Sequence, residues 1–165
     1  MPDRKPANHA ARARFGLIPI AQAIFVVAGS IVAAYLVWVH YQQDALVCGL
    51  GDCEKVQTSS YAEFAGIPIA WFGLALYLAI AALYVTRRLG TVAEDIAAIL
   101  VVGASFAGTL AVAWLTYLEL WVIHAICQWC VAFAIVTVLL FVVSVLDLRV
   151  VLSTPIDHPD QPESS

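Results

Sequence analysis

Four long stretches of the sequence contain no charged residue, and this feature limits most strongly what the chain can fold into. Each stretch has at least 22 residues; they are Phe15–Val39, Ala65–Thr86, Ile96–Leu118 and Ala125–Leu146. About 20 helical residues cross a bilayer, at roughly 1.5 Å per residue. A Lys, Arg or Asp at the centre of such a helix costs about 2.5–3.5 kcal/mol. The pattern predicts an all-α integral membrane protein with four transmembrane helices.

The composition supports this interpretation. The chain is 62% hydrophobic and 12% charged, whereas a soluble domain is about 45–50% apolar and about 25% charged. A soluble domain of 165 residues could not bury so much apolar surface, so the lipid bilayer must act as solvent. The short connections between the stretches favour antiparallel neighbours and therefore a four-helix bundle. No basic stripe is interleaved with aromatic residues, so we expect no nucleic-acid partner.

The basic residues predict the orientation. Only Lys55 lies between the first two stretches; the other seven are Arg4, Lys5, Arg12, Arg14, Arg87, Arg88 and Arg149. The positive-inside rule then predicts a multi-pass protein of the cell membrane with both termini in the cytoplasm. We expect a basic cytoplasmic segment over 1–14, a membrane domain over 15–147 and a disordered cytoplasmic tail over 148–165.

The loop between the first two spans is predicted to be extracytoplasmic. Its stretch Val56–Phe64 could form a short interfacial helix capped by Ser or Thr hydroxyls. Only the short link from Glu119 to His124 separates the third and fourth spans on the same side.

Four cysteines gather at this outer face, which is the oxidising side of a cell membrane. Cys48 and Cys53 lie in the outer loop, and Cys127 and Cys130 form a C-x-x-C at the start of the fourth span. Residues three apart share one face of a helix, and the positive end of the helix dipole favours thiolate in the first turn. Thiolates exchange with disulfides, so two adjacent pairs suggest a relay of electrons.

Other interpretations of the cysteines remain open. They could form two structural disulfides in a non-catalytic membrane scaffold, although the small ring of C-x-x-C is strained and easily reduced. They could bind zinc, although the wider spacing of Cys48 and Cys53 argues against it, and we expect no metal. They could also be inert buried residues.

A wider set of residues resembles a known family. The set comprises Cys48, Cys53-Glu54-Lys55-Val56, Ser59, Gly66-Ile67-Pro68, Gly73 and Cys127-Gln128-Trp129-Cys130. In this order, over residues 15–147, the chain resembles bacterial members of the vitamin K epoxide reductase family, in the stand-alone form without a fused thioredoxin domain. The resemblance implies an enzyme, a thiol:quinone oxidoreductase, that passes electrons through two cysteine pairs to a membrane quinone.

The resemblance also implies a role for each cysteine. Cys127 and Cys130 would be the active-site pair, with Cys130 facing the quinone. Cys48 and Cys53 would be the shuttle pair, with Cys53 forming a transient mixed disulfide with Cys127. Cys48 would exchange with a separate DsbA-like thioredoxin-fold protein that forms disulfide bonds.

The quinone implied by the resemblance is menaquinone or ubiquinone, as the electron-accepting substrate. Animal members hold their naphthoquinone with an Asn and a Tyr, and this sequence has Ile69 and Ala134 at those places. The departure favours a generic membrane quinone over an epoxide.

Further residues are candidates for the quinone site and for proton delivery. Quinone-binding candidates are Ser59, Trp71, Phe72, Trp129 and Phe133, although aromatic residues at this depth also serve as core or interfacial belt. Glu119 and His124 lie near the C-x-x-C and could deliver protons to a quinone, or could simply be hydrated interfacial groups.

Overall fold

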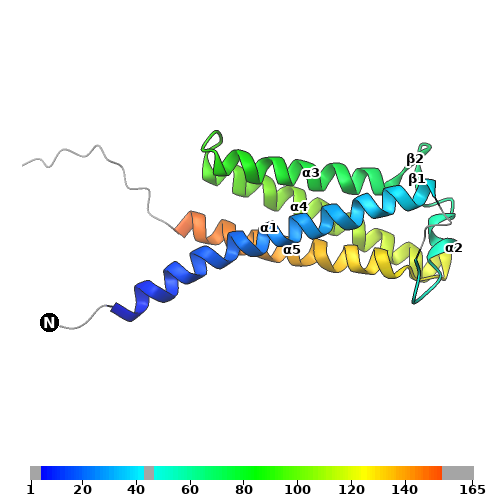
Figure 1. The fold of residues 1–165 in the computed structure, drawn as a ribbon, viewed down its shortest axis with the longest axis horizontal. Helices are drawn as coiled ribbons and strands as arrows, with labels where there is room; N and C mark the ends of the chain where they lie inside the picture. The colour runs from blue at the N-terminus through cyan, green and yellow to red at the C-terminus, as the bar shows by residue number, and fades with distance from the viewer. Residues whose placement is uncertain (1–4, 43–46, 154–165) are drawn as a thin grey trace, which may run out of the picture.

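The computed structural model describes residues 5–42 and 47–153, with side chains from Gly16 onward. Four long helices run side by side along the molecule, and the short elements of the loop between the first two cover one end (Figure 1). The long helices are α1 (Lys5–Tyr41), α3 (Ile69–Arg88), α4 (Glu94–Tyr117) and α5 (Gln128–Ser153). All four are long and apolar enough to cross a membrane. The predicted four-helix membrane bundle is confirmed.

The helices form a closed ring. α1 and α4 each pack against both α3 and α5, so successive helices that share a short connection are antiparallel neighbours. The outward faces carry exposed large apolar residues, among them Ile31, Leu78, Phe106 and Leu139. Such faces would be costly in water but are suited to lipid, where helices associate through close packing of small residues.

Small residues bring the helices together near the middle of the bundle. Gly29 of α1 lies against the ring of Tyr77 of α3, which is fully buried. Gly108 of α4 lies against Leu76 of α3 and Thr137 of α5. A larger side chain at either glycine would clash with the neighbouring helix. The two glycines therefore allow α1 and α4 to pack closely against α3.

The first and last residues of the helices differ from those of the uncharged segments in the sequence. α1 begins at Lys5 rather than Phe15, and α5 continues to Ser153, beyond the boundary at which the tail was predicted. The absence of charge marks where lipid surrounds the chain, whereas helical hydrogen bonds continue into the polar interface. Residues 154–165 of the predicted tail lie outside the described residues.

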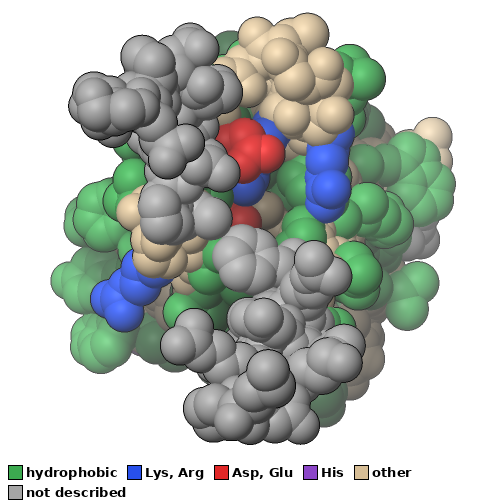
Figure 2. Space-filling view, turned by 90° about the vertical axis from the view of Figure 1, so that its left-hand side faces the viewer, with side chains coloured by type: hydrophobic (Ala, Val, Ile, Leu, Met, Phe, Trp, Pro, Cys, Tyr) green, Lys and Arg blue, Asp and Glu red, His purple; other side chains and the backbone are tan. Residues whose placement is uncertain are grey.

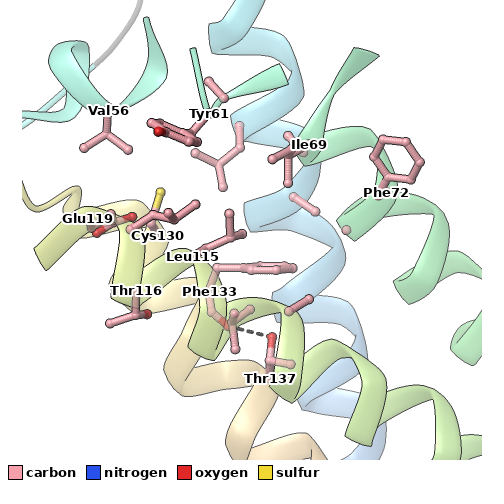
Figure 3. A pocket seen from close by; sticks show the side chains of 18 of the residues that line it. Val56, Tyr61, Ile69, Phe72, Leu115, Thr116, Glu119, Cys130, Phe133 and Thr137 are labelled. Atoms are coloured by element: carbon pink, nitrogen blue, oxygen red, sulfur yellow. Dashed lines mark hydrogen bonds between the residues drawn. The ribbon is translucent and has the colours of Figure 1, made fainter. Parts of the chain in front are cut away.

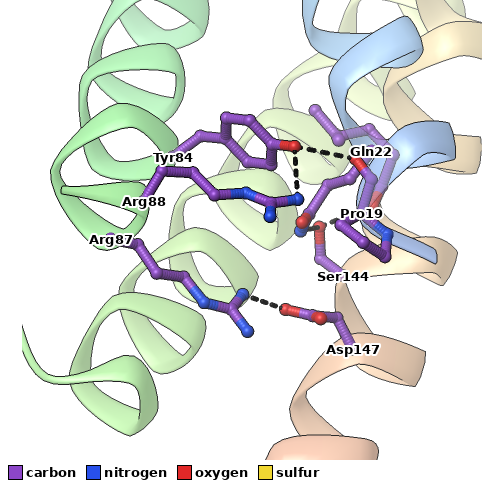
Figure 4. A network of polar contacts seen from close by, with 8 residues as sticks. Pro19, Gln22, Tyr84, Arg87, Arg88, Ser144 and Asp147 are labelled. Carbon is purple, nitrogen blue, oxygen red and sulfur yellow. Dashed lines mark hydrogen bonds and ion pairs between the residues drawn. The ribbon is translucent and has the colours of Figure 1, made fainter. Parts of the chain in front are cut away.

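Polar contacts link the helices at the end opposite the cysteines. Arg87 of α3 forms an ion pair with Asp147 of α5, and Gln22 of α1 donates to Ser144 of α5 at 3.2 Å (Figure 4). Asp147 is buried, and a buried carboxylate needs such a partner, since removal of one side of a buried pair costs about 3–5 kcal/mol.

A second set of polar contacts lies at the same end. Arg88 donates to the hydroxyl of Tyr84 at 2.9 Å, and that hydroxyl donates to the carbonyl of Pro19 at 3.1 Å. Figure 2 shows acidic and basic side chains near the centre of this end, with hydrophobic side chains toward its periphery. The charged groups therefore lie where the helices emerge from the apolar band.

The outer loop contains the short helix α2 (Cys53–Gln57) and a hairpin of β1 (Glu63–Phe64) and β2 (Ile67–Pro68). The expected helix exists but not over Val56–Phe64. The hydroxyls of Thr58 and Ser59, which follow the helix, donate back to the carbonyls of Glu54 and Val56, both at 2.8 Å.

The hairpin replaces the remainder of the predicted loop helix. Ala65 and Gly66 have φ of 54° and 79°, which is the geometry of a two-residue turn between antiparallel strands. The backbone of Ile69 then donates to Ala62 at 2.9 Å and closes the loop against the start of α3. The hairpin accounts for the start of α3 at Ile69 instead of Ala65.

The packing of Gly29 yields a testable prediction. A Cβ at Gly29 would lie 1.9 Å from Cε1 of the buried Tyr77 ring, so Gly29→Ala should lower the free energy of unfolding by about 1–3 kcal/mol. Titration with sodium dodecyl sulfate in mixed micelles, followed by circular dichroism, measures this value. Gly103→Ala is the control, because no heavy atom lies within 4 Å of its Cβ position. Equal midpoints for the two variants would contradict the packing.

Candidate active site

The C-x-x-C lies at the N-terminus of α5. Cys127 immediately precedes the helix, and its carbonyl accepts the first helical hydrogen bond, from the backbone of Val131 at 3.0 Å. Cys130 follows within the first turn, as the spacing predicts. Both are free thiols; Cys127 is fully buried and Cys130 is partly buried. The pair therefore forms a dithiol at the positive end of a helix.

The Cys127 thiol is the more acidic partner by its surroundings. A hydrogen bond from the Cys130 thiol, helped by the backbone N–H groups of Cys130 and Trp129, lowers the pKa of Cys127 to about 7. Burial and the charge of Glu119 act in the opposite direction, but less strongly in sum. The lowered pKa favours the Cys127 thiolate, the form that attacks disulfides.

A turn of π-helix, η2 (Leu118–Ile123), occupies the link that was expected to be a simple connection. It ends at His124, which has φ of 52°, and the backbone of Ala125 donates back to the carbonyl of Glu119 at 3.1 Å. The wider π turn directs the Glu119 carboxylate inward, where it accepts a hydrogen bond from the backbone of Cys127 at 3.3 Å and contacts Cys130. Glu119 is buried, whereas His124 is exposed.

The second cysteine pair is a disulfide between Cys48 and Cys53. Cys48 is exposed in the loop, whereas Cys53 begins α2 and packs in one buried cluster with Val56, Ala125 and Cys127. The predicted pairs are thus both present, one as a disulfide and one as a dithiol. Within residues 5–42 and 47–153, no three Cys, His, Asp or Glu side chains form a set that could hold a metal ion.

Backbone hydrogen bonds hold the loop against the start of α5, and we call this contact the seat of the loop. Gly51 and Cys127 form an antiparallel bridge, and the backbone of Asp52 donates to the carbonyl of Ile126 at 2.9 Å. Gly51 has φ of 86°, and a Cβ there would lie 2.1 Å from the carbonyl oxygen of Ile126, so the approach requires glycine. The seat holds the disulfide directly beside the dithiol.

A cavity of about 310 Å³ lies beneath the loop, between the four long helices (Figure 3). Its wall includes Cys130 and Glu119 near the loop, and a hydrogen bond of 3.1 Å joins Tyr77 and Thr137 at a deeper level. Most of the other lining side chains are apolar; they include Leu36, Val56, Ile69, Leu76, Val112, Leu115, Leu118 and Ile123. The cavity suits a flat, largely apolar molecule placed against the Cys130 sulfur.

The predicted quinone-site residues divide into two groups. Ser59, Phe72 and Phe133 line the cavity. Trp71 lies outside its lining and donates to the Tyr41 hydroxyl at 3.3 Å, and Trp129 packs against Tyr35 of α1. The cavity face of α5 is formed by Cys130 and residues three and seven positions later, so Trp129 lies on the neighbouring face.

Other side chains of the site were not predicted. Thr137 follows Cys130 by seven residues, a helical spacing that would have identified it. Tyr61 and Thr116 also line the cavity, but their approach depends on the hairpin and on the packing of α4, which no local pattern reveals. Gln128 was named only as part of the C-x-x-C motif, yet its amide accepts a hydrogen bond from the backbone of Leu50.

The fold and site together define a membrane-embedded thiol–disulfide redox protein. Comparison with known protein families matches the Vitamin K epoxide reductase family over residues 20–145, and the chain belongs to this family. Membership implies a thiol oxidoreductase that reduces a quinone. No curated protein matches the sequence.

The low pKa of Cys127 predicts a pH dependence. The ultraviolet thiolate absorbance that is lost in Cys127→Ser should titrate with a midpoint near pH 7. The largest cause of this low pKa is the hydrogen bond from Cys130. Cys130→Ala should move the midpoint upward, toward the ordinary value of about 8.5. A midpoint near 8.5 in the parent protein, or no shift in Cys130→Ala, would contradict this electrostatic account.

Proposed function

We propose that the protein is a quinone-dependent thiol oxidoreductase that reoxidises an extracytoplasmic thioredoxin-fold partner for disulfide bond formation. One observation carries the proposal: the four sulfurs run from the surface to the cavity. Cys48 is exposed, Cys53 and Cys127 are buried together, and Cys130 lines the cavity. This order provides a path for thiol–disulfide exchange from a protein partner to a quinone.

The exchange steps follow from this order. A partner thiolate attacks the Cys48 sulfur and releases the Cys53 thiolate, and the second partner thiol then displaces Cys48 and leaves the partner oxidised. The Cys53 thiolate attacks the Cys127 sulfur of an oxidised Cys127–Cys130 pair and releases Cys130. Cys48 then attacks Cys53, which restores the loop disulfide and leaves the dithiol reduced. The described state, with a loop disulfide and a C-x-x-C dithiol, matches the product of these steps.

The dithiol then reduces the quinone. The Cys130 thiol passes its proton to a quinone oxygen, and its sulfur adds to the quinone ring. The Cys127 thiolate then attacks the Cys130 sulfur, which forms the disulfide and breaks the carbon–sulfur bond, so that the electron pair leaves with the quinone. The quinone takes up two protons to become hydroquinone, and the Cys130 thiol supplies one of them. The second must come from another group, and Glu119 contacts Cys130 at the cavity wall. We assign proton delivery to Glu119 rather than to the exposed His124.

Ser59, Phe72 and Phe133 support binding of the quinone ring, and Tyr61 adds a hydroxyl at the same cavity. Ile69 also lines the cavity, without the polar group that animal members use at this place. The substrate would therefore be a generic membrane quinone, menaquinone or ubiquinone, held mainly by apolar contact.

The orientation is part of the proposal. Arg87 and Arg88 lie at the opposite end of the bundle from the cysteines, which supports a cytoplasmic position for that end by the positive-inside rule. The cysteine end would then face the oxidising side of the cell membrane, where a separate DsbA-like partner could reach Cys48.

Proton delivery by Glu119 can be tested alone. Glu119→Gln keeps an oxygen for the backbone hydrogen bond from Cys127 but removes the transferable proton. Reduction of quinone by the pre-reduced protein in a single turnover should slow about 100-fold, within the usual contribution of a general acid. His124→Gln is the control and should react like the parent protein. Equal rates for Glu119→Gln and the parent would remove Glu119 from the mechanism.

The test of the function itself is turnover. Purified protein in detergent should reduce ubiquinone or menaquinone when supplied with a reduced thioredoxin-fold protein. Cys130→Ala should abolish all quinone reduction, because Cys130 lines the cavity. Cys48→Ala should abolish turnover with the protein partner but should still allow one turnover from a pre-reduced Cys127–Cys130 pair. If Cys130→Ala behaves like the parent, a scaffold with structural disulfides becomes the better account.

A further inference from the structure

The side chain of Gln128, between the two active-site cysteines, binds the backbone of the outer loop. Its Oε1 accepts hydrogen bonds from the backbone N–H groups of Gly49 at 3.2 Å and Leu50 at 2.9 Å. Its Nε2 donates to the carbonyl of Val47 at 3.3 Å. One amide side chain therefore holds the loop on both sides of Cys48.

Trp129 and Tyr35 complete this contact. The indole N–H of Trp129 donates to the same Val47 carbonyl at 2.8 Å, and the Tyr35 hydroxyl accepts from the Val47 backbone N–H at 3.2 Å. The Tyr35 and Trp129 rings pack with centroids 4.6 Å apart. Both backbone groups of Val47 are thus engaged by side chains of α1 and α5.

The side-chain bonds of Gln128 differ from the backbone pairing that holds Gly51 and Asp52. The bonds of Gln128 lie at the exposed surface, where each contributes only about 0.5–1.5 kcal/mol, and they lie far from the bundle core. Gly51 and Asp52 are instead fixed by backbone pairing with Cys127 and Ile126. We therefore expect the four-helix bundle to fold without the Gln128 bonds to residues 47–50.

The bonds from Gln128 and Trp129 to residues 47–50 hold the loop in place when its disulfide opens. The Cys48–Cys53 bond closes a small ring that keeps the loop in shape. Once a partner thiol attacks Cys48, that constraint is lost, and the attacked segment is the exposed one. The backbone pairing of Gly51 and Asp52 still holds one end of the loop, and the bonds to residues 47–50 hold the other end. Both together keep the Cys53 thiolate beside the Cys127 sulfur, and intramolecular attack gains its speed from such a held geometry.

We propose that Gln128 and Trp129 form a latch that holds the loop while its disulfide is open. Both are positioning residues that raise the effective concentration of Cys53 at Cys127. The C-x-x-C motif would thus supply two functions, because its cysteines exchange electrons and its middle residues bind the donor loop. This inference rests on the proposed order of exchange, in which Cys53 attacks Cys127.

The test measures that effective concentration without any enzyme activity. Cys48→Ser together with Cys130→Ser leaves one sulfur from each pair, and equilibration in glutathione redox buffers gives the stability of a Cys53–Cys127 disulfide. Peptide mapping by mass spectrometry identifies the bond. Addition of Gln128→Leu should lower the effective concentration about tenfold, the equivalent of one or two weak hydrogen bonds.

Three companion variants sharpen the result. Gln128→Glu retains the acceptor oxygen for Gly49 and Leu50, so it should lose less than Gln128→Leu. Trp129→Phe keeps an aromatic ring but removes the bond to Val47 and should also lower the value. Gln42→Leu makes the matched chemical change at the end of α1 and should have no effect. Unfolding midpoints in sodium dodecyl sulfate should remain equal in all four.

The outcomes separate the latch from the proposed function. If Gln128→Leu leaves the effective concentration unchanged, or lowers it only as the unfolding midpoint falls, the latch is wrong. If no Cys53–Cys127 disulfide forms in the background variant, both the latch and the exchange order are wrong. If the disulfide forms and weakens as predicted but quinone is never reduced, the latch stands and the proposed oxidase function fails.

Discussion

The seat of the outer loop on the first turn of α5 is the contact on which the site depends. The Gly51–Cys127 bridge and the bond from Asp52 to Ile126 join segments more than 70 residues apart in the chain. They bring a disulfide from the loop against a dithiol at the start of a helix. The helices themselves pack through Gly29, Tyr77 and Gly108, away from this contact, which is what holds the two cysteine pairs together.

The bundle gives the dithiol two different environments. Toward the loop, Cys127 receives hydrogen bonds that stabilise its thiolate. Toward the membrane interior, Cys130 borders an apolar cavity that could admit a lipid-soluble molecule and exclude water. One turn of helix thus separates the sulfur that packs beside Cys53 from the sulfur that borders the cavity. Glu119, brought inward by the π turn, is the acidic side chain at their boundary.

Much of this arrangement could be predicted from the sequence. Four uncharged segments determined the number of spans, and the positions of the cysteines determined that both pairs share one face. The π turn could not be predicted, because nothing in Leu118–Ile123 distinguishes it from a loop. The loop helix was predicted over Val56–Phe64 but lies at Cys53–Gln57, and the Thr58 and Ser59 hydroxyls bond to carbonyls at its end. The contact of Gln128 with Leu50, 78 residues earlier, could not be predicted either.

The central claim is that the described redox state is the one that reduces quinone. Protein prepared with the Cys48–Cys53 disulfide intact and Cys127 and Cys130 reduced should be mixed with one equivalent of ubiquinone, quenched with acid and mapped by mass spectrometry. The account predicts that a Cys127–Cys130 disulfide appears together with hydroquinone, while Cys48–Cys53 is unchanged. A Cys127–Cys130 pair that stays reduced in the presence of quinone would contradict it.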